Sequence, residues 1–211
     1  MAITNGYTTL ALLKAELGIA DTTDDTALEN VIEATSRALD LLCSQLRHCP
    51  TRFYTTASDE VRYYTASFED RVVIDDLVSV TSVKTDAGQD GTYETTLTAY
   101  FTEPRNATLN GLPYTHLTAK EGYAFPLMPH AVEVTGKFGF NATASIPDYI
   151  AGACLLASER LFKRRDAIFG VSGTTQLGTA QVVNALQQDG ELMALLSNVP
   201  ARPRGLWMHY G

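Results

Sequence analysis

The chain has 211 residues, which accommodates one or two domains, and 45% of them are apolar, enough for a hydrophobic core. Its formal net charge of −8 argues against a protein that grips DNA by its phosphates, because such proteins carry a basic face. Three cysteines, Cys43, Cys49 and Cys154, predict free thiols in a reducing compartment rather than a disulfide framework. The sequence shows neither a signal peptide nor an apolar run of membrane-spanning length, so no membrane partner is expected.

Two amphipathic helices are predicted at the beginning of the chain. Residues 8–17 carry leucines at three- and four-residue spacing, preceded by a capping hydroxyl of Thr8 or Thr9. Gly18 follows them and suits the left-handed position after a helix end. Residues 24–47 begin in an acidic stretch that complements the helix dipole. They carry an apolar stripe at helical period, formed by Leu28, Val31, Ile32, Thr35, Ala38, Leu39, Leu42 and Leu46.

Between residues 51 and 144 the hydrophobic period changes from that of a helix to that of a strand. Short runs rich in aromatic and β-branched residues predict a small antiparallel sheet or sandwich of about six to eight strands. Asp75-Asp76 is expected to form a turn, and residues 86–91, rich in Asp and Gly, a hairpin loop. The predicted strands cover residues 52–55, 61–65, 71–74, 77–84, 92–94, 97–101, 114–118 and 131–138.

A third helix is predicted over residues 145–166, opened by Ser145-Ile146-Pro147-Asp148 with a capping serine and a first-turn proline. Its last turn is basic, as the carbonyl end of the helix dipole favours. Residues 167–211 then change character. They are rich in glycine, threonine and proline and predict an extended C-terminal arm that contains one short helix at Glu191 to Ser197.

The residue patterns needed for catalysis or metal binding are missing from the sequence. Asp86-x-Gly-x-Asp90-Gly91 faintly resembles a calcium loop, but Gly88 and Leu97 occupy positions where oxygen ligands are needed. The four histidines are scattered, and neither a nucleophile elbow nor a phosphate-binding glycine loop is present. The sequence therefore predicts a protein that is not an enzyme and requires neither a cofactor nor a metal.

Two groups of residues are candidates for partner binding. The densest basic cluster ends the third helix, where four cations exceed what helix capping requires. This cluster is expected to contact DNA or an acidic partner surface, and consists of Arg160, Lys163, Arg164 and Arg165. The second group lies in the proline-containing end of the arm, and its arginines and aromatics are typical of interface hot spots. It consists of Arg202, Arg204, Leu206, Trp207 and Tyr210. The alternative is that Trp207 folds back onto the core of its own chain.

Three stretches, YTTLALLKAELGI, DDTALENVIEATSRALDLL and ERLFKRRDAIFGVSG, resemble the head–tail connector (adaptor) proteins of long-tailed bacteriophages. The resemblance implies an α+β fold, a three-helix bundle with a large antiparallel β insertion between the second and third helices and an extended C-terminal tail. The insertion is longer here than the simple hairpin of the family, which leaves its role open. The implied divisions are helices one and two, the insertion, helix three and the arm, at residues 1–50, 51–144, 145–166 and 167–211.

The same resemblance implies a structural virion protein at the head–tail junction, made in the cytoplasm of the host bacterium. About twelve copies would form a ring below the portal protein, by head-to-tail contacts that close. The C-terminal segments would reach the portal, and the opposite face would receive the next neck, stopper or tail protein. Genomic DNA would pass through the lumen without sequence-specific binding, and an acidic channel wall would let it slide.

Two alternative functions remain from the sequence. The first is a neck stopper or tail-terminator ring protein, although those proteins are mainly β and the helices at both ends speak against this class. The second is a ligand-binding β-sandwich module. Such a module needs aromatic side chains exposed on one sheet face, for which Tyr63, Tyr64, Tyr93 and Tyr100 are candidates, although such residues are more often cross-strand pairs.

Overall fold

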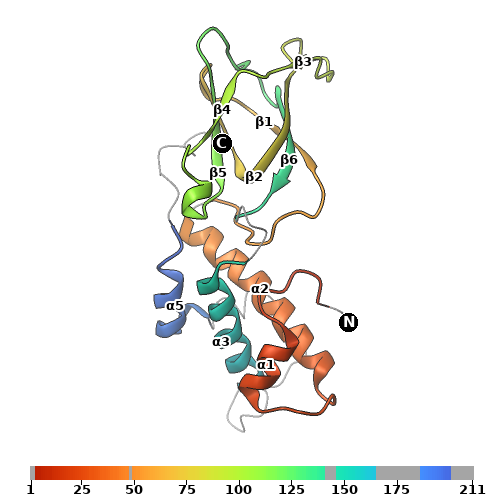
Figure 1. Ribbon diagram of the computed structural model, residues 1–211, viewed down its shortest axis with the longest axis vertical. Helices are drawn as coiled ribbons and strands as arrows, with labels where there is room; N and C mark the ends of the chain where they lie inside the picture. Colours follow the sequence, from red (N-terminus) through yellow and green to blue (C-terminus); the bar gives the residue numbers. More distant parts are fainter. Residues whose placement is uncertain (1–2, 48, 141–145, 165–185, 201–211) are drawn as a thin grey trace. The chain divides into compact units, whose positions relative to one another are not determined.

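The computed structural model describes residues 3–47, 49–140, 146–164 and 186–200 (Figure 1). The chain divides into two compact units. The helical unit contains the described residues up to Pro50 and those from Ile146 to Pro200, and the β unit contains those from Thr51 to Phe140. The described residues form four α-helices and a six-stranded antiparallel sheet, so the prediction of an α+β protein is confirmed. None of the described helices has the length and apolar character needed to cross a membrane.

The helical unit begins with helix α1, Leu10–Leu17, whose ends follow the sequence signals. The Thr9 side chain accepts a hydrogen bond from the backbone N–H of Leu12 and caps the helix, because the first turn has no intrahelical partners for its N–H groups. Gly18 ends α1 in the left-handed conformation, with φ of 68°. Helix α2, Asp25–Arg47, has 23 residues and buries one long face.

Two further helices complete the helical unit: α3, Asp148–Arg164, and the short α5, Gly190–Leu196. Helix α3 packs against α1, α2 and α5. The core where α1, α2 and α3 meet is aliphatic apart from one phenylalanine, and consists of Leu13, Leu28, Ile32 and Phe162. Leu192 and Leu196 of α5 are buried as well. The short helix expected in the arm is therefore folded onto the helical unit.

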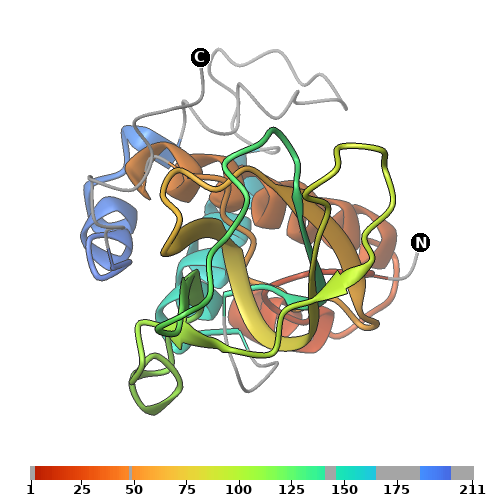
Figure 2. The same ribbon diagram turned by 90° about the horizontal axis from the view of Figure 1, so that it is seen from above.

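The β unit is a single sheet with the strand order β1-β6-β2-β5-β4, in which β3 also pairs with β2. All pairings are antiparallel. Strand β2 is the longest and bends, pairing with β5 through its first half and with β6 through its second (Figures 1 and 2). The strands are β1, Glu60–Tyr64; β2, Arg71–Thr85; β3, Thr95–Thr96; β4, Tyr100–Glu103; β5, Tyr114–Ala119; and β6, Val132–Phe138.

Three expectations for the β unit are wrong. Residues 92–94 do not form a strand, and the short strand β3 begins only after them, at Thr95. Asp75-Asp76 does not form a turn but lies inside the continuous strand β2. The two acids are tolerated there because the Asp75 carboxylate is hydrogen-bonded and the register of β2 against β5 shifts between Val73 and Leu77, as at a β-bulge. Residues 52–55 do not form a strand either: Phe53 instead packs its ring on Phe140, with 5.0 Å between the ring centroids.

The core of the β unit lies between the inner faces of its strands and contains more aromatic rings than that of the helical unit. It includes Tyr64, Val72, Ile74, Leu77, Val83, Leu117, Phe125, Val132, Val134 and Phe138. Strands β2 and β6 lie close together at Gly136, where a Cβ atom would lie 2.1 Å from the backbone oxygen of Ser79. Only glycine allows this approach, so Gly136 sets the spacing of the two central strands.

The chain enters and leaves the β unit along one short seam. The backbone N–H of Thr56 donates to the carbonyl oxygen of Phe138 at 2.8 Å, and the N–H of Phe138 donates to Thr56 Oγ1 at 3.1 Å. Phe53, shortly before Thr56 in the sequence, packs its ring on Phe140, which shortly follows Phe138. Residues 53–56 and 138–140 are thus fastened to each other inside the β unit.

Candidate functional site

Two of the four cations predicted at the end of the third helix, Arg160 and Lys163, are paired with carboxylates of the helical unit. Arg160 of α3 donates to Asp189 and to Glu191, which lie at the N-terminal end of α5. Lys163 pairs with Glu159 one turn earlier in α3. Arg164, the last residue of α3, is exposed, and Arg165 lies outside the described residues. Arg160 is therefore engaged within the helical unit, whereas Arg164 at the end of α3 is exposed.

Arg160 joins α3 to α5 by pairing with Asp189, the residue that also caps α5. Asp189 is the N-cap of α5 and accepts a hydrogen bond from the backbone N–H of Leu192. The hydrogen bond from Arg160 is the main cause that lowers the pKa of Asp189, and the backbone N–H of Leu192 lowers it further. A sequence argument could find Asp189 as a cap, from its place before an apolar run, but not its distant arginine partner.

The predicted partner-binding residues of the arm, Arg202, Arg204, Leu206, Trp207 and Tyr210, lie outside the described residues. The chain just before them is folded, since Val199 is buried and the backbone oxygen of Pro200 accepts a hydrogen bond from the guanidinium of Arg47. The described chain is therefore folded onto the helical unit as far as Pro200.

The first residues of the chain are fixed to α2 by a polar cluster. The Tyr7 hydroxyl donates to the Asp40 carboxylate, and the Tyr7 backbone N–H donates to Ser36 Oγ at 3.0 Å. Arg37 pairs with Asp40 at 3.0 Å, lies over the Tyr7 ring at 5.2 Å and donates to the backbone oxygen of Asn5. Tyr7 is buried by these contacts. The N-terminal segment is consequently a part of the helical unit.

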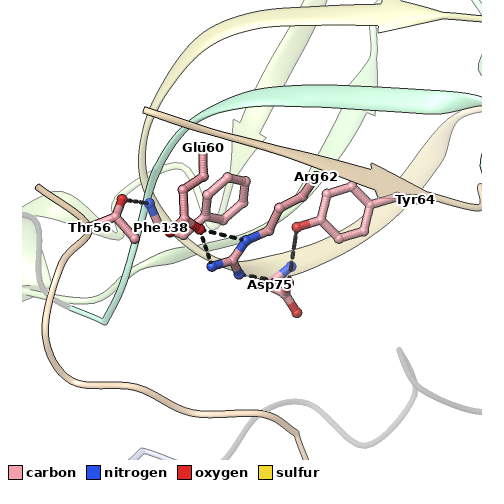
Figure 3. A network of polar contacts seen from close by, with 6 residues as sticks. All are labelled: Thr56, Glu60, Arg62, Tyr64, Asp75 and Phe138. Carbon is pink, nitrogen blue, oxygen red and sulfur yellow. Dashed lines mark hydrogen bonds and ion pairs between the residues drawn. The ribbon is translucent and has the colours of Figure 1, made fainter. Parts of the chain in front are cut away.

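The β unit contains a network around Arg62 that joins strands β1 and β2 (Figure 3). The Arg62 guanidinium donates to Glu60 at 2.7 Å and to Asp75 at 2.9 Å, and it lies over the Phe138 ring, 4.0 Å from the centroid. The Tyr64 hydroxyl donates to the same Asp75 carboxylate at 3.1 Å. Because β1 has β6 as its strand partner, these side chains add a second attachment, from β1 to β2.

The Arg62 network is suited to holding strands rather than to transferring protons. Burial first, and then the negative charge of Asp75, raises the pKa of Tyr64 above its ordinary value, so its hydroxyl remains a neutral donor. Sequence reasoning missed this network. The available signal was the alternation in Glu60–Tyr64, which places Arg62 and Tyr64 on one face of a strand together with Glu60.

Within the described ranges, the structure brings together no group of three or more His, Cys, Asp or Glu side chains that could hold a metal ion. Cys43, Cys49 and Cys154 are free thiols and all three are buried. Burial, reinforced by the charge of Asp40, raises the pKa of the Cys43 thiol to about 12. Burial also raises the pKa of Cys154. Such thiols are poor nucleophiles near neutral pH, because the thiolate is the reactive form.

Comparison with known proteins finds similarity at the level of the fold. The sequence matches no family model and no curated protein. Two solved structures contain a chain of similar fold: the neck of a native gene transfer agent particle computed with C12 symmetry, and the virion of a native gene transfer agent particle. In both, the TM-score is 0.51 and the identity 18%, over 88% of this chain and 91% of the other chain. The similarity thus extends over both the helical and the β unit.

Proposed function

We propose that this protein is a head–tail connector (adaptor) of a bacteriophage or phage-like particle, a structural virion component without catalytic activity. The fold similarity to a chain from a gene transfer agent neck, over nearly the whole length of both chains, is the observation that carries the proposal. That neck was computed with C12 symmetry. We propose the same arrangement here, a homo-oligomeric ring of about twelve subunits below the portal. The protein would be made in the host cytoplasm and reside at the head–tail junction.

In this proposal the ring joins the DNA-filled head to the neck or tail and continues the DNA channel. Helices α1, α2 and α3 act as a three-helix bundle, and the β unit is the insertion between the second and third helices. Support comes from the pairwise packing of these three helices and from the shared core of Leu13, Leu28, Ile32 and Phe162. The genomic DNA passes without sequence-specific contacts, consistent with a net charge of −8.

The portal contact is assigned to the C-terminal arm. Its arginines and aromatics, Arg202, Arg204, Leu206, Trp207 and Tyr210, have the composition of an interface hot spot. Arg164 and Arg165 remain candidates for a contact with DNA or with an acidic partner. Arg160 and Lys163 are weaker candidates, because their charges are directed to Asp189, Glu191 and Glu159 within the helical unit.

The main rival is a neck stopper or tail-terminator ring. The helical content of this chain favours the adaptor, since four described helices make up a complete unit with a core of its own. A ligand-binding β-sandwich is disfavoured by the positions of its candidate aromatics. Tyr64 is buried in the core and Tyr100 packs against that core, whereas Tyr63 is exposed on the other face of β1, so the four tyrosines do not share one exposed sheet face.

Electron microscopy of particles is the decisive experiment. We expect this chain as a closed ring directly below the portal, on the axis of the particle. A ring one layer further from the head would favour the stopper, and a ring at the end of the tail tube the terminator. A single copy, or a position off the axis, would contradict all three ring functions.

The portal contact is tested by truncation. Removal of residues 201–211 should leave the fold intact, because the described core residues of the helical unit all precede residue 201, but should abolish attachment to connector-deficient heads. Trp207→Ala alone should weaken attachment by about 2 kcal/mol, as expected for a hot spot. The measurement is binding and DNA retention after wild-type or truncated protein is added to the heads. Equal binding of the truncated chain would exclude the arm as the anchor, and unfolding on truncation would show that Trp207 belongs to the core of its own chain.

A further inference from the structure

The two edge strands of the β unit carry different surfaces. Strands β1 and β4 stand at opposite ends of the strand order, so among the described residues each has one side without a strand partner. Unpaired edges invite association with another chain unless they are protected. Both edges here carry exposed apolar side chains; the charged side chains beside them are carboxylates on one edge, and on the other they include two cations stacked on an aromatic ring.

The first surface, the acidic edge, is defined by Val61, Tyr63, Asp90, Tyr93 and Glu94. Val61 and Tyr63 point outward from β1, and each is 50% exposed, while their neighbours Arg62 and Tyr64 point inward. The Tyr93 ring packs on Tyr63, and its hydroxyl donates to the backbone oxygen of His130. Asp90 and Glu94, both exposed, flank Tyr93 in the chain. The result is an apolar centre with an acidic rim.

The environment of Tyr93 is consistent with negative charge at this edge. Desolvation is the main cause that raises the pKa of Tyr93, and the neighbouring Tyr63, Asp86 and Glu133 raise it further. The nearby cation Lys84 is already paired with Glu133. A second molecule that binds here gains most if it brings both an apolar group and positive charge.

The second surface, the basic edge, is defined by Phe101, Arg105, Leu109 and Lys120. The Arg105 guanidinium and the Lys120 ammonium both lie over the ring of Phe101 in β4, at 4.4 and 4.8 Å from its centroid. Both cations are exposed, and neither has a carboxylate within ion-pair distance among the described residues. Leu109, in the connection between β4 and β5, is 84% exposed. The two cations are thus held over the Phe101 ring without a direct ion pair to a described carboxylate.

A protein surface fits the basic edge better than a nucleic acid. Glu103 on β4 and Glu121 beside Lys120 interrupt the positive charge. Phosphate-backbone binding requires several cations on an uninterrupted face, whereas one pair of cations beside an aromatic ring suits one or two carboxylates next to an apolar group. The acidic edge presents that combination, two carboxylates around a tyrosine.

We propose that the acidic edge of one copy of this chain binds the basic edge of the next. Tyr63 and Tyr93 would pack against Phe101 and Leu109, and Asp90 and Glu94 would pair with Arg105 and Lys120. The two surfaces differ, so the contact is head-to-tail, the kind that generates a ring when the rotation per subunit closes. This inference rests on the proposed ring, and it assigns the β unit a role in joining neighbouring subunits.

The test reverses the charges on each edge separately and then on both. Arg105→Glu with Lys120→Glu, and Asp90→Lys with Glu94→Lys, should each lower the number of copies per particle about tenfold, because like charges then face each other. The chain that carries all four substitutions should recover to within about threefold of the wild type, because the complementarity is restored with its sign inverted. The measurement is the ratio of this chain to portal protein in purified particles, by quantitative mass spectrometry.

Two controls keep the result interpretable. Arg52→Glu makes the same kind of charge change on an exposed residue of the β unit outside both edges, and should leave the copy number unchanged. Thermal unfolding of each purified variant excludes a folding defect, and a pair variant that misfolds is replaced by the corresponding Gln or Asn neutralisation. A nonspecific defect cannot restore the copy number in the variant that carries all four substitutions, so that recovery is the decisive outcome.

The outcomes separate this inference from the proposed function. A ring that is visible in wild-type particles but whose copy number is unaffected by either pair of reversals would overturn the edge contact and leave the connector function standing. The edge contact would also be overturned if each pair of reversals lowered the copy number and the variant with all four substitutions did not recover it. Rings of normal copy number that lose DNA on Arg105→Glu with Lys120→Glu would assign these cations to DNA instead. Absence of a ring in wild-type particles would overturn both proposals.

Discussion

The helical unit and the β unit distribute their charged side chains in different ways. In the helical unit the cations Lys14, Arg37 and Arg160 each bind a carboxylate that lies on another turn or another helix. In the β unit the Arg62 network does the same, but Arg105 and Lys120 are stacked on an aromatic ring without a carboxylate. These cations of the helical unit therefore fasten its own segments, whereas Arg105 and Lys120 of the β unit form no ion pair with a described carboxylate.

The cores differ in a related way. The helical cluster of Leu13, Leu28, Ile32 and Phe162 is mainly aliphatic, and polar contacts such as Tyr7 with Asp40 hold the N-terminal segment on α2. The cluster in the β unit contains more aromatic rings, and at Gly136 the backbones of β2 and β6 are too close for a side chain. We therefore expect the two units to respond to different kinds of substitution, each with little effect on the other.

The largest effect is expected from Gly136→Ala in β6. The new methyl group would lie 2.1 Å from the Ser79 backbone oxygen, so β2 and β6 would have to separate. We expect a loss of about 4 kcal/mol, above the usual range of about 1–3 kcal/mol for overpacking, because the clash is with backbone that cannot change rotamer. Hydrogen exchange measured by mass spectrometry should show the loss of protection in residues 51–140 only. Gly152→Ala in α3 is the matched control, since nothing lies within 4 Å of its Cβ position, and helix propensity predicts a gain of about 0.5–1 kcal/mol.

Ile32→Ala should produce the converse result in the helical unit. Ile32 is fully buried between α1, α2 and α3, and truncation to alanine leaves a cavity, so we expect a loss of about 3 kcal/mol. Protection should fall in α1, α2 and α3 and persist in the β strands. Leu12→Ala, at a position that is 55% exposed, should be close to neutral. Equal loss of protection in both units would contradict their independence.

Arg62→Met tests the network that attaches β1 to β2. The substitution keeps an apolar side chain of similar length but removes the ion pairs with Glu60 and Asp75 and the contact with the Phe138 ring. We expect a loss of about 2 kcal/mol, measured by denaturant unfolding, with increased exchange in β1 first. Arg62→Lys should recover part of the loss, because lysine keeps the charge but cannot bind two carboxylates as a planar fork. Full recovery by lysine would show that charge alone matters.

The smallest effect is expected from Arg160→Gln, and it should depend on pH. Arg160 lowers the pKa of Asp189, so this interaction stabilises the fold above the ordinary carboxyl pKa of about 3.9 and is lost as the pH falls through the lower folded value. The variant should unfold at a slightly lower temperature than the wild type at pH 7, and the difference should shrink towards pH 3. Lys163→Gln, which breaks a pair within α3, should leave the exchange of α5 unchanged. A difference that grows on acidification would contradict this assignment.

The sequence predicted the helices well because their signals are local. The Thr9 cap, the Gly18 helix end and the apolar period of α2 depend only on residues close together in the sequence, and the structure has helices at these positions. Most strands were also found, since Leu77 to Lys84 and Ala131 to Phe138 alternate clearly. The class of fold follows from these periods alone.

The sequence could not predict contacts that depend on the tertiary fold. Asp75 was read as a turn residue because acids favour turns, and only Arg62 and Tyr64, more than ten residues away, explain its place in a strand. Phe53 looked like a strand residue, but its partner Phe140 is distant in the chain. Arg160 was assigned to a partner because its carboxylates, Asp189 and Glu191, lie beyond a long connection.

The seam between residues 53–56 and 138–140 has a consequence for how this architecture changes over evolutionary time. Because the incoming and outgoing segments are fastened to each other by the Thr56–Phe138 hydrogen bonds and the Phe53–Phe140 rings, the ends of the β unit meet at one place. A segment whose ends meet can be lengthened, shortened or exchanged as a cassette while the host helices keep their own connections. A related chain could thus carry a simple hairpin at this position, and the ninety residues or so between Thr51 and Phe140 would mark a gain on the same helical scaffold.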